Sequence, residues 1–192
     1  MAGIPGGSSD RRRFFREAVV KALGPIAGYL DGRLPRGPDR VLLRPPGAIE
    51  EDAFLETCSR CGACADACPA DAIFLLGQSH GDRAGTPVID PDRAPCVVCV
   101  GLLCTNTCAS GALLPLADPR SIRMGLAEVY EPLCTRTQGE DCTLCVERCP
   151  IGETALRFHG AGPPEVLAGC VGCGVCQHAC PTSPKAIVVK PR

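Results

Sequence analysis

Sixteen cysteines form four groups of four along this 192-residue chain, and no cysteine lies outside them. Closely spaced thiols bind metals or form disulfides, and the spacing within each group indicates which chemistry applies. The groups are Cys58, Cys61, Cys64 and Cys68; Cys96, Cys99, Cys104 and Cys108; Cys134, Cys142, Cys145 and Cys149; and Cys170, Cys173, Cys176 and Cys180.

The first and fourth groups have the spacing C-x2-C-x2-C-x3-C-P. This spacing is typical of bacterial ferredoxins, in which three thiolates hold one 4Fe-4S cluster and the fourth binds a neighbouring cluster. Small residues such as Gly62 and Gly174 let backbone N–H groups approach the sulfurs, and the proline then turns the chain away. Because the fourth cysteine is shared in this way, such groups occur in pairs.

The second and third groups are variants of the same pattern. The second has four residues between its middle cysteines and Ala109 in place of the proline, and the third has seven residues between its first two cysteines. Both still offer four thiols. The sequence therefore predicts four 4Fe-4S clusters, with all sixteen cysteines as iron ligands.

Cysteines at close spacing have two other common uses in proteins, disulfides and structural zinc sites. A disulfide scaffold is typical of short secreted chains, and the repeated ferredoxin spacing argues against it. Structural zinc sites usually combine two distant C-x2-C pairs rather than four thiols within eleven residues. Both alternatives are less favoured than iron-sulfur clusters.

The composition supports a fold built around cofactors. The chain has five Phe, two Tyr and no Trp, against 22 Gly and 19 Pro, so a conventional apolar core is small. Metal binding then contributes folding free energy, and we expect the apo-protein to be largely unfolded. The formal net charge is −1, and four oxidised clusters would bring it to about −9. This charge argues against nucleic acid and favours a redox protein with a basic face.

Residues 1–47 are predicted to be a tail, an amphipathic helix and a Pro/Arg-rich linker, followed by a four-motif region at 48–192. Apolar residues recur at helical spacing within 11–30, and we expect this helix to lie on a partner or a membrane surface. The arginines at 11–13 also resemble a twin-arginine export signal, which is the alternative. The favoured location is cytoplasmic and membrane-associated, the alternative periplasmic. No segment has the roughly 20 apolar residues needed to span a bilayer.

Short apolar segments follow each cysteine group. Residues 72–76 and 86–90 predict a hairpin, as do 112–114 with 126–130 and 155–158 with 165–167, while 186–189 predict a final strand. A short helix is expected at 48–57, and His178 is expected to face solvent. The fold class is therefore α+β with little regular secondary structure, in which two bacterial-ferredoxin-like units surround the clusters.

The order of several motifs resembles that of the NapG/MauM-type ferredoxins over nearly the whole chain, and such proteins are also similar to NapF-type proteins. The motifs are RRRFFR at 11–16, LRPPGAI at 43–49, the first cysteine group, IRMGLA at 122–127 and the third cysteine group. The resemblance implies a polyferredoxin that relays single electrons from a quinol-oxidising membrane module or a ferredoxin to a partner oxidoreductase. It implies a carrier rather than a catalyst. The alternative, from the NapF-type proteins, is a cytoplasmic assembly factor for an iron-sulfur molybdoenzyme.

The sequence is compatible with two pairings of the groups. The second group resembles the second motif of the four-cluster subunits of molybdenum oxidoreductases, and that resemblance favours a nested arrangement. In it, Cys180 completes the site of the first group and Cys149 that of the second. The tandem alternative pairs the first group with the second and the third with the fourth.

Overall fold

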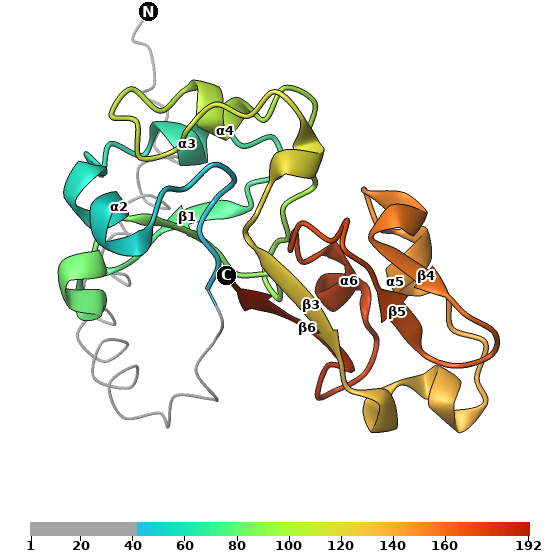
Figure 1. Cartoon of the computed structure of the whole chain (residues 1–192). Helices are drawn as coiled ribbons and strands as arrows, with labels where there is room; N and C mark the ends of the chain where they lie inside the picture. Colours follow the sequence, from blue (N-terminus) through green and yellow to red (C-terminus); the bar gives the residue numbers. More distant parts are fainter. Residues whose placement is uncertain (1–41) are drawn as a thin grey trace, which may run out of the picture. The chain divides into compact units, whose positions relative to one another are not determined.

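The computed structural model describes residues 42–192 of the chain (Figure 1). The chain divides into two compact units, residues 1–39 and 40–192, and the described residues belong to the second. The helix expected at 11–30 lies outside the described residues, and the division of the chain at residue 47 stays a prediction. Within residues 42–192, no helix is both long enough and apolar enough to cross a bilayer.

Two of the expected hairpins are present. Strand β1 (Ile73–Leu75) pairs antiparallel with β2 (Pro87–Ile89), and β4 (Leu156–Phe158) pairs antiparallel with β5 (Pro164–Val166). Each hairpin follows a cysteine group and joins segments that are close in sequence. Both predictions are confirmed. These hairpins could be predicted because alternating apolar residues and a nearby turn are local signals in the sequence.

The third expected hairpin is wrong. Strand β3 (Gly125–Val129) pairs antiparallel with the C-terminal strand β6 (Ile187–Pro191), and not with residues 112–114 (Figure 1). The register places Ala127 opposite Val189, and both side chains are buried. The local pairing would close a shorter loop, but the entropic cost of loop closure rises only slowly with length. The free energy gained by burying these apolar residues therefore outweighs the extra cost of the longer loop.

Residues 112–114 have a different partner. Ala48 forms an antiparallel bridge with Leu113, and the N–H of Leu114 donates to the carbonyl of Gly47 at 2.7 Å. The segment before the first group thus pairs with the segment after the second, just as β3, before the third group, pairs with β6, after the fourth. The same pairing occurs twice, once in residues 42–116 (the first half) and once in residues 117–192 (the second half).

Each cysteine group contains a short helix that carries its third cysteine. Three of these helices follow a residue with positive φ: Gly62 at 80°, Leu102 at 42° and Gly174 at 85°. This left-handed residue turns the loop sharply into the helix. The four helices are α3 (Ala63–Asp66), α4 (Leu103–Asn106), α5 (Leu144–Glu147) and α6 (Val175–Ala179).

The remaining helices are also short. Helix α2 (Glu51–Thr57) leads into the first cysteine group, as expected, and its only buried residue is Phe54. The 3-10 turns are η1 (Gln78–Arg83), η2 (Pro119–Ser121), η3 (Glu131–Leu133), η4 (Thr135–Gln138) and η5 (Gly152–Thr154).

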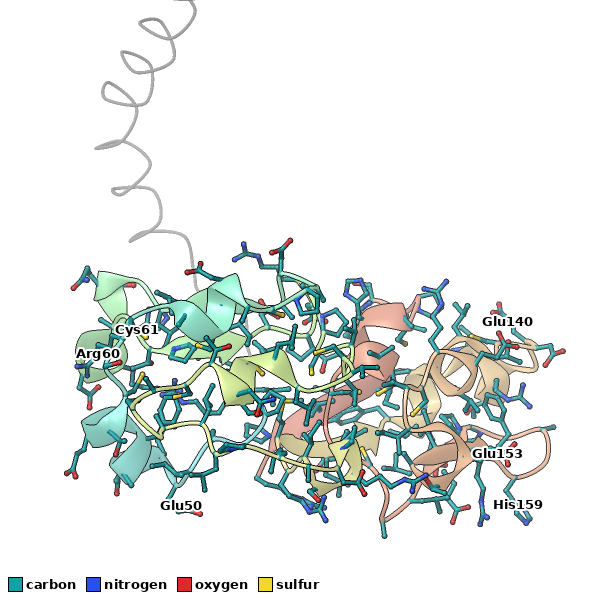
Figure 2. The ribbon with its side chains drawn as sticks, turned by 90° about the horizontal axis from the view of Figure 1, so that it is seen from above. Glu50, Arg60, Cys61, Glu140, Glu153 and His159 are labelled. Carbon is teal, nitrogen blue, oxygen red and sulfur yellow. The ribbon has the colours of Figure 1, made fainter. Side chains whose placement is uncertain are left out.

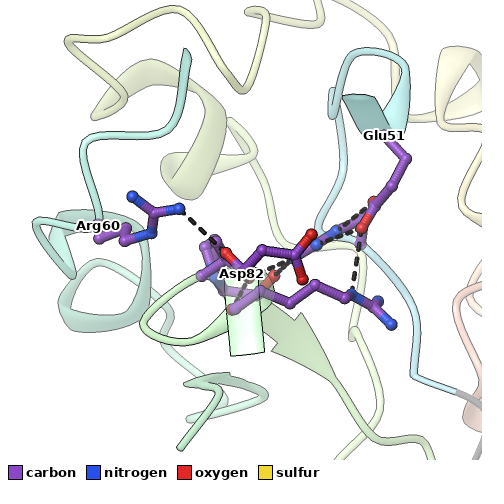
Figure 3. Close-up of polar contacts among 7 residues, drawn as sticks. Glu51, Arg60 and Asp82 are labelled. Atoms are coloured by element: carbon purple, nitrogen blue, oxygen red, sulfur yellow. Dashed lines mark hydrogen bonds and ion pairs between the residues drawn. The ribbon is translucent and has the colours of Figure 1, made fainter. Parts of the chain in front are cut away.

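An ion-pair network fixes α2 against the β1–β2 hairpin (Figure 3). Arg44 donates to both carboxylate oxygens of Glu51 at 2.6 and 2.7 Å, and its guanidinium lies 4.4 Å from the centre of the Phe54 ring. Arg83 lies 3.2 Å from the same carboxylate. The hydrogen bond from Arg44 holds the pKa of Glu51 below its usual value of 4.5.

The core of the described residues is mostly aliphatic. Phe54 is fully buried, and most of the other large buried side chains are Leu, Ile and Val. Leu43, at the end of the segment expected to be a linker, is also fully buried and exchanges two 2.8 Å backbone hydrogen bonds with Ile89. Short helices and strands of this mixed kind are consistent with ferredoxin-like 4Fe-4S domains.

Candidate iron-sulfur sites

All sixteen cysteines lie within the described residues, and all are free thiols. They gather in sets of four, and three of these sets line separate cavities. The first cavity is bounded by Cys134, Cys142 and Cys145 of the third group and by Cys180 of the fourth. Its empty volume is about 380 Å³, including the part open to solvent.

The second cavity reverses the roles of the two groups. Cys170, Cys173 and Cys176 of the fourth group line it together with Cys149 of the third, around an empty volume of about 330 Å³. The third and fourth groups therefore exchange their last cysteines. This exchange is the arrangement in which bacterial ferredoxins hold two clusters side by side.

The third cavity lies in the first half. Cys96, Cys99 and Cys104 of the second group line it with Cys68 of the first, and its empty volume is about 340 Å³. Pro46, Ala72 and Leu102 contribute apolar walls, so a bound group would be shielded from water on these sides.

The fourth set is formed by Cys58, Cys61 and Cys64 with Cys108 of the second group. Burial raises the pKa of Cys64 to about 11, and the charges of Cys58 and Cys108 add to this rise. The backbone N–H of Ala63 is the main cause that lowers the pKa of Cys61, and the charge of Cys108 opposes it. Because Cys68 lines the cavity of the second group, Cys108 is the cysteine left to complete the first group. Cys61 is the exposed member of the sixteen, and it lies beside Arg60 in Figure 2.

The nested arrangement favoured from the sequence is wrong. Cys180 lies with the third group and not the first, and Cys149 lies with the fourth group and not the second. The cause is the repeated strand pairing: each half closes on itself, which brings α3 against α4 and α5 against α6. Consecutive groups are therefore neighbours, as in the tandem alternative.

Burial controls the protonation of the inner thiols. It raises the pKa of Cys96 to about 12 and that of Cys104, Cys145 and Cys173 to about 11. Nearby cysteines add to these rises, because two thiolates repel each other. Such thiols keep their protons until a metal displaces them, so binding releases protons.

The fourth cysteines of two groups have a different environment. Burial raises the pKa of Cys180, but the Thr182 hydroxyl, whose Oγ1 lies 3.2 Å from Sγ, and backbone N–H groups outweigh it and lower the pKa. Burial also raises the pKa of Cys108, but hydrogen bonds outweigh it and lower the pKa. The donors include the N–H of Leu113, at 3.3 Å from the sulfur, and the hydroxyl of Ser110. Donors of this kind stabilise a thiolate and shift the potential of a cluster that it binds.

Sequence reasoning missed these two hydroxyls. Ser110 and Thr182 each stand two residues after the last cysteine of a group, and this shared position was the available signal. His178 is exposed, as expected, but its Nδ1 also donates to the carbonyl of Pro91 at 3.1 Å.

The thiol sets fit a multi-iron group better than a single ion. A structural zinc ion draws four sulfurs to about 2.3 Å from one point. Within residues 42–192, no group of three or more His, Cys, Asp or Glu is arranged to hold one metal ion. The thiols instead surround cavities, with small residues and backbone N–H groups at the loops. Four thiols around a cavity match the ligand set of a 4Fe-4S cluster.

Comparison with known proteins supports this chemistry. A family model for a 4Fe-4S dicluster domain matches residues 57–112, which include the whole of the first two cysteine groups. The fold and the thiol sets thus define an iron-sulfur protein of the ferredoxin type. No solved structure matches the chain.

The relatives identify the family. The chain is 37% identical to the ferredoxin-type protein NapG of Escherichia coli, covering 95% of this chain and 86% of the relative. It is 34% identical to the methylamine utilization ferredoxin-type protein MauM of Methylobacillus flagellatus, over 95% and 84%. The ferredoxin-type protein NapF of Escherichia coli is 29% identical over 81% and 89%. The chain belongs to the NapG/MauM family of ferredoxin-type proteins, as the sequence motifs indicated.

Proposed function

We propose that this protein holds four 4Fe-4S clusters in two tandem pairs and relays single electrons to a partner oxidoreductase. The observation that carries the proposal is the set of cavities, each lined by three cysteines of one group and one from its neighbour. All sixteen cysteines are then iron ligands. Each half is a bacterial-ferredoxin-like unit, with one hairpin and one pairing of its first and last segments.

A bound 4Fe-4S cluster supplies reversible one-electron chemistry. The polypeptide would hold the clusters in position and set their reduction potentials. Buried walls such as Leu102 and Val171 exclude water, and N–H and hydroxyl donors at the sulfurs stabilise negative charge. The chain thus acts as a carrier rather than as a catalyst on its own.

The partner is a redox protein with a basic face. Residues 42–116 contain nine acidic residues against four arginines, and this excess lies in the half that contains the exposed Cys61. Opposite charges steer redox partners together and orient them. The donor is a quinol-linked module or a ferredoxin, and the cytoplasmic, membrane-associated location stays a prediction.

Reversible redox cycling tests the relay. The protein is loaded with iron and sulfide without oxygen. It is then reduced and reoxidised by a one-electron acceptor while the visible absorbance of the clusters is followed. A relay is expected to keep its absorbance through repeated cycles and to reduce an acceptor protein. Loss of the clusters within one cycle would contradict the relay and favour the assembly role.

A further inference from the structure

Cysteines from the two halves are in direct backbone contact. The N–H of Cys96 donates to the carbonyl oxygen of Cys173 at 3.0 Å. Cys96 lines the cavity in the first half, and Cys173 lines one of the cavities in the second half.

Two further hydrogen bonds tie the same segments together. The Nε2 of Gln177 donates to Asp92 at 3.0 Å, and the Nδ1 of His178 donates to the carbonyl of Pro91 at 3.1 Å. Gln177 is buried, and its Oε1 accepts the N–H of Val189 at 2.8 Å. These hydrogen bonds hold residues 91–96 in a fixed position against residues 172–178, and the two segments together are here named the junction.

Gly174 lets these segments approach. Its φ is +85°, and an added Cβ would lie 2.7 Å from Cβ and 2.9 Å from Cγ of Pro91. These separations are shorter than van der Waals contact, and the Pro91 ring has no flexible end that could move aside. Any side chain at position 174 must push residues 91–96 away from the loop of the fourth group.

We propose that Gly174 is a positioning residue that sets the separation between the cluster sites of the two halves. The inference rests on the proposed function, in which one electron leaves a site in one half and one electron enters a site in the other. No bond or proton is transferred in this step. The exchanged cysteines link the sites within each half, and the junction links the halves. The sites then follow one another in the order of the first, second, fourth and third groups.

The test is Gly174→Ala in the full chain loaded with iron and sulfide. Hydrogen exchange of the peptide 91–98, measured by mass spectrometry with fragmentation to resolve single amides, reports the Cys96 N–H bond. Loss of this bond is expected to make exchange of that amide faster on the order of fivefold. Pulsed electron paramagnetic resonance of the reduced protein is expected to show weaker dipolar coupling between the two halves, because this coupling falls with the cube of distance.

Two variants serve as controls. Gly152→Ala introduces a side chain at a similar φ of +76° with nothing within 4 Å, so it carries the same backbone strain without the clash. We expect it to leave both measurements unchanged. Adding Pro91→Gly to Gly174→Ala removes the two clashing ring atoms and is expected to restore slow exchange and strong coupling.

The outcomes separate the inference from the function on which it rests. Full iron content in Gly174→Ala with unchanged exchange and coupling would overturn the positioning role alone. Wild-type protein without four clusters would overturn the proposed function, whatever the variants do. If Gly174→Ala loads too little iron, adding Pro91→Gly, which removes the clashing ring atoms, is expected to restore the iron content, and failure to restore it would overturn the inference.

Discussion

At the scale of single residues, the last cysteine of each group decides which cluster sites exist. Cys180 lies in the cavity of the third group, and Cys149 lies in that of the fourth. A thiol removed from one group should therefore empty a site that is mainly built by another. Pairs of substitutions show which cysteines share a site, because two substitutions in one site remove no more iron than a single substitution.

We predict that Cys180→Ala lowers the iron content from about 16 to about 12 per chain. Adding Cys142→Ala, which affects the same site, should leave it at about 12, whereas adding Cys61→Ala should lower it to about 8. Iron analysis of protein loaded without oxygen checks this. The nested arrangement predicts the opposite order for the two double variants, so that result would refute the tandem pairs.

The hydroxyl of Thr182 provides a second prediction at this scale. Its bond to the Cys180 sulfur stabilises the reduced, more negative cluster, so Thr182→Val should lower the potential of that site. The expected shift is about 40 mV, since one net hydrogen bond acts on a one-electron couple. A potentiometric titration measures it, and Thr182→Ser, which keeps the hydroxyl, should match the wild type. Equal potentials in all three proteins would show that the contact does not tune the site.

At the scale of elements, the two halves repeat one strand pairing and need glycine at the corresponding place. An added Cβ would lie 2.2 Å from the carbonyl oxygen of Leu114 at Gly47, and 2.3 Å from that of Lys190 at Gly125. Both glycines stand where the segment before a cysteine group meets the segment that closes the half. Close backbone approach of this kind excludes any other residue.

Gly47→Ala should therefore disrupt the first half alone. We expect iron to fall to about 8 per chain while the second half still binds its two clusters. Gly111→Ala is the matched control, because its φ of +78° is similar and nothing lies within 4 Å of the added Cβ. Loss of nearly all iron in Gly47→Ala would show that the halves do not load independently.

The elements that were predictable from the sequence are those set by local signals. The hairpins at β1–β2 and β4–β5 join nearby segments, and helix α2 leads directly into Cys58. The pairing of β3 with β6 could not be seen, because Val129 and Ile187 are far apart in sequence and many apolar segments could have served as partners. The spacing of the cysteines was sufficient to predict the iron ligands. It does not show which neighbouring group each last cysteine joins, because the sequence around the last cysteines is similar, and only the fold shows this exchange.

At the scale of the whole molecule, the cavities occupy the place of a conventional core. Phe54 is the one fully buried aromatic residue within the described part of the chain. Five of the sixteen cysteines are buried and ten are partly buried around the cavities. Four thiols facing one another repel when ionised, and they gain nothing from packing alone. The free energy that stabilises this arrangement therefore comes largely from metal binding.

Removal of iron should unfold residues 42–192. We expect a chelator with a reductant to abolish the far-ultraviolet circular dichroism of the strands and the hydrogen-exchange protection of β3 and β6. Adding iron and sulfide back without oxygen should restore both. An apo-protein that keeps its protection at β3 and β6 would show that the polypeptide packing alone is sufficient.

The most direct test of the account is an anaerobic redox titration followed by electron paramagnetic resonance, with iron, sulfide and zinc measured on the same sample. We predict about 16 iron and 16 sulfide per chain, negligible zinc, and four reducible centres that show spin coupling in two pairs. Well-loaded protein with about half that iron, or with zinc in place of iron, would contradict four clusters in two tandem pairs.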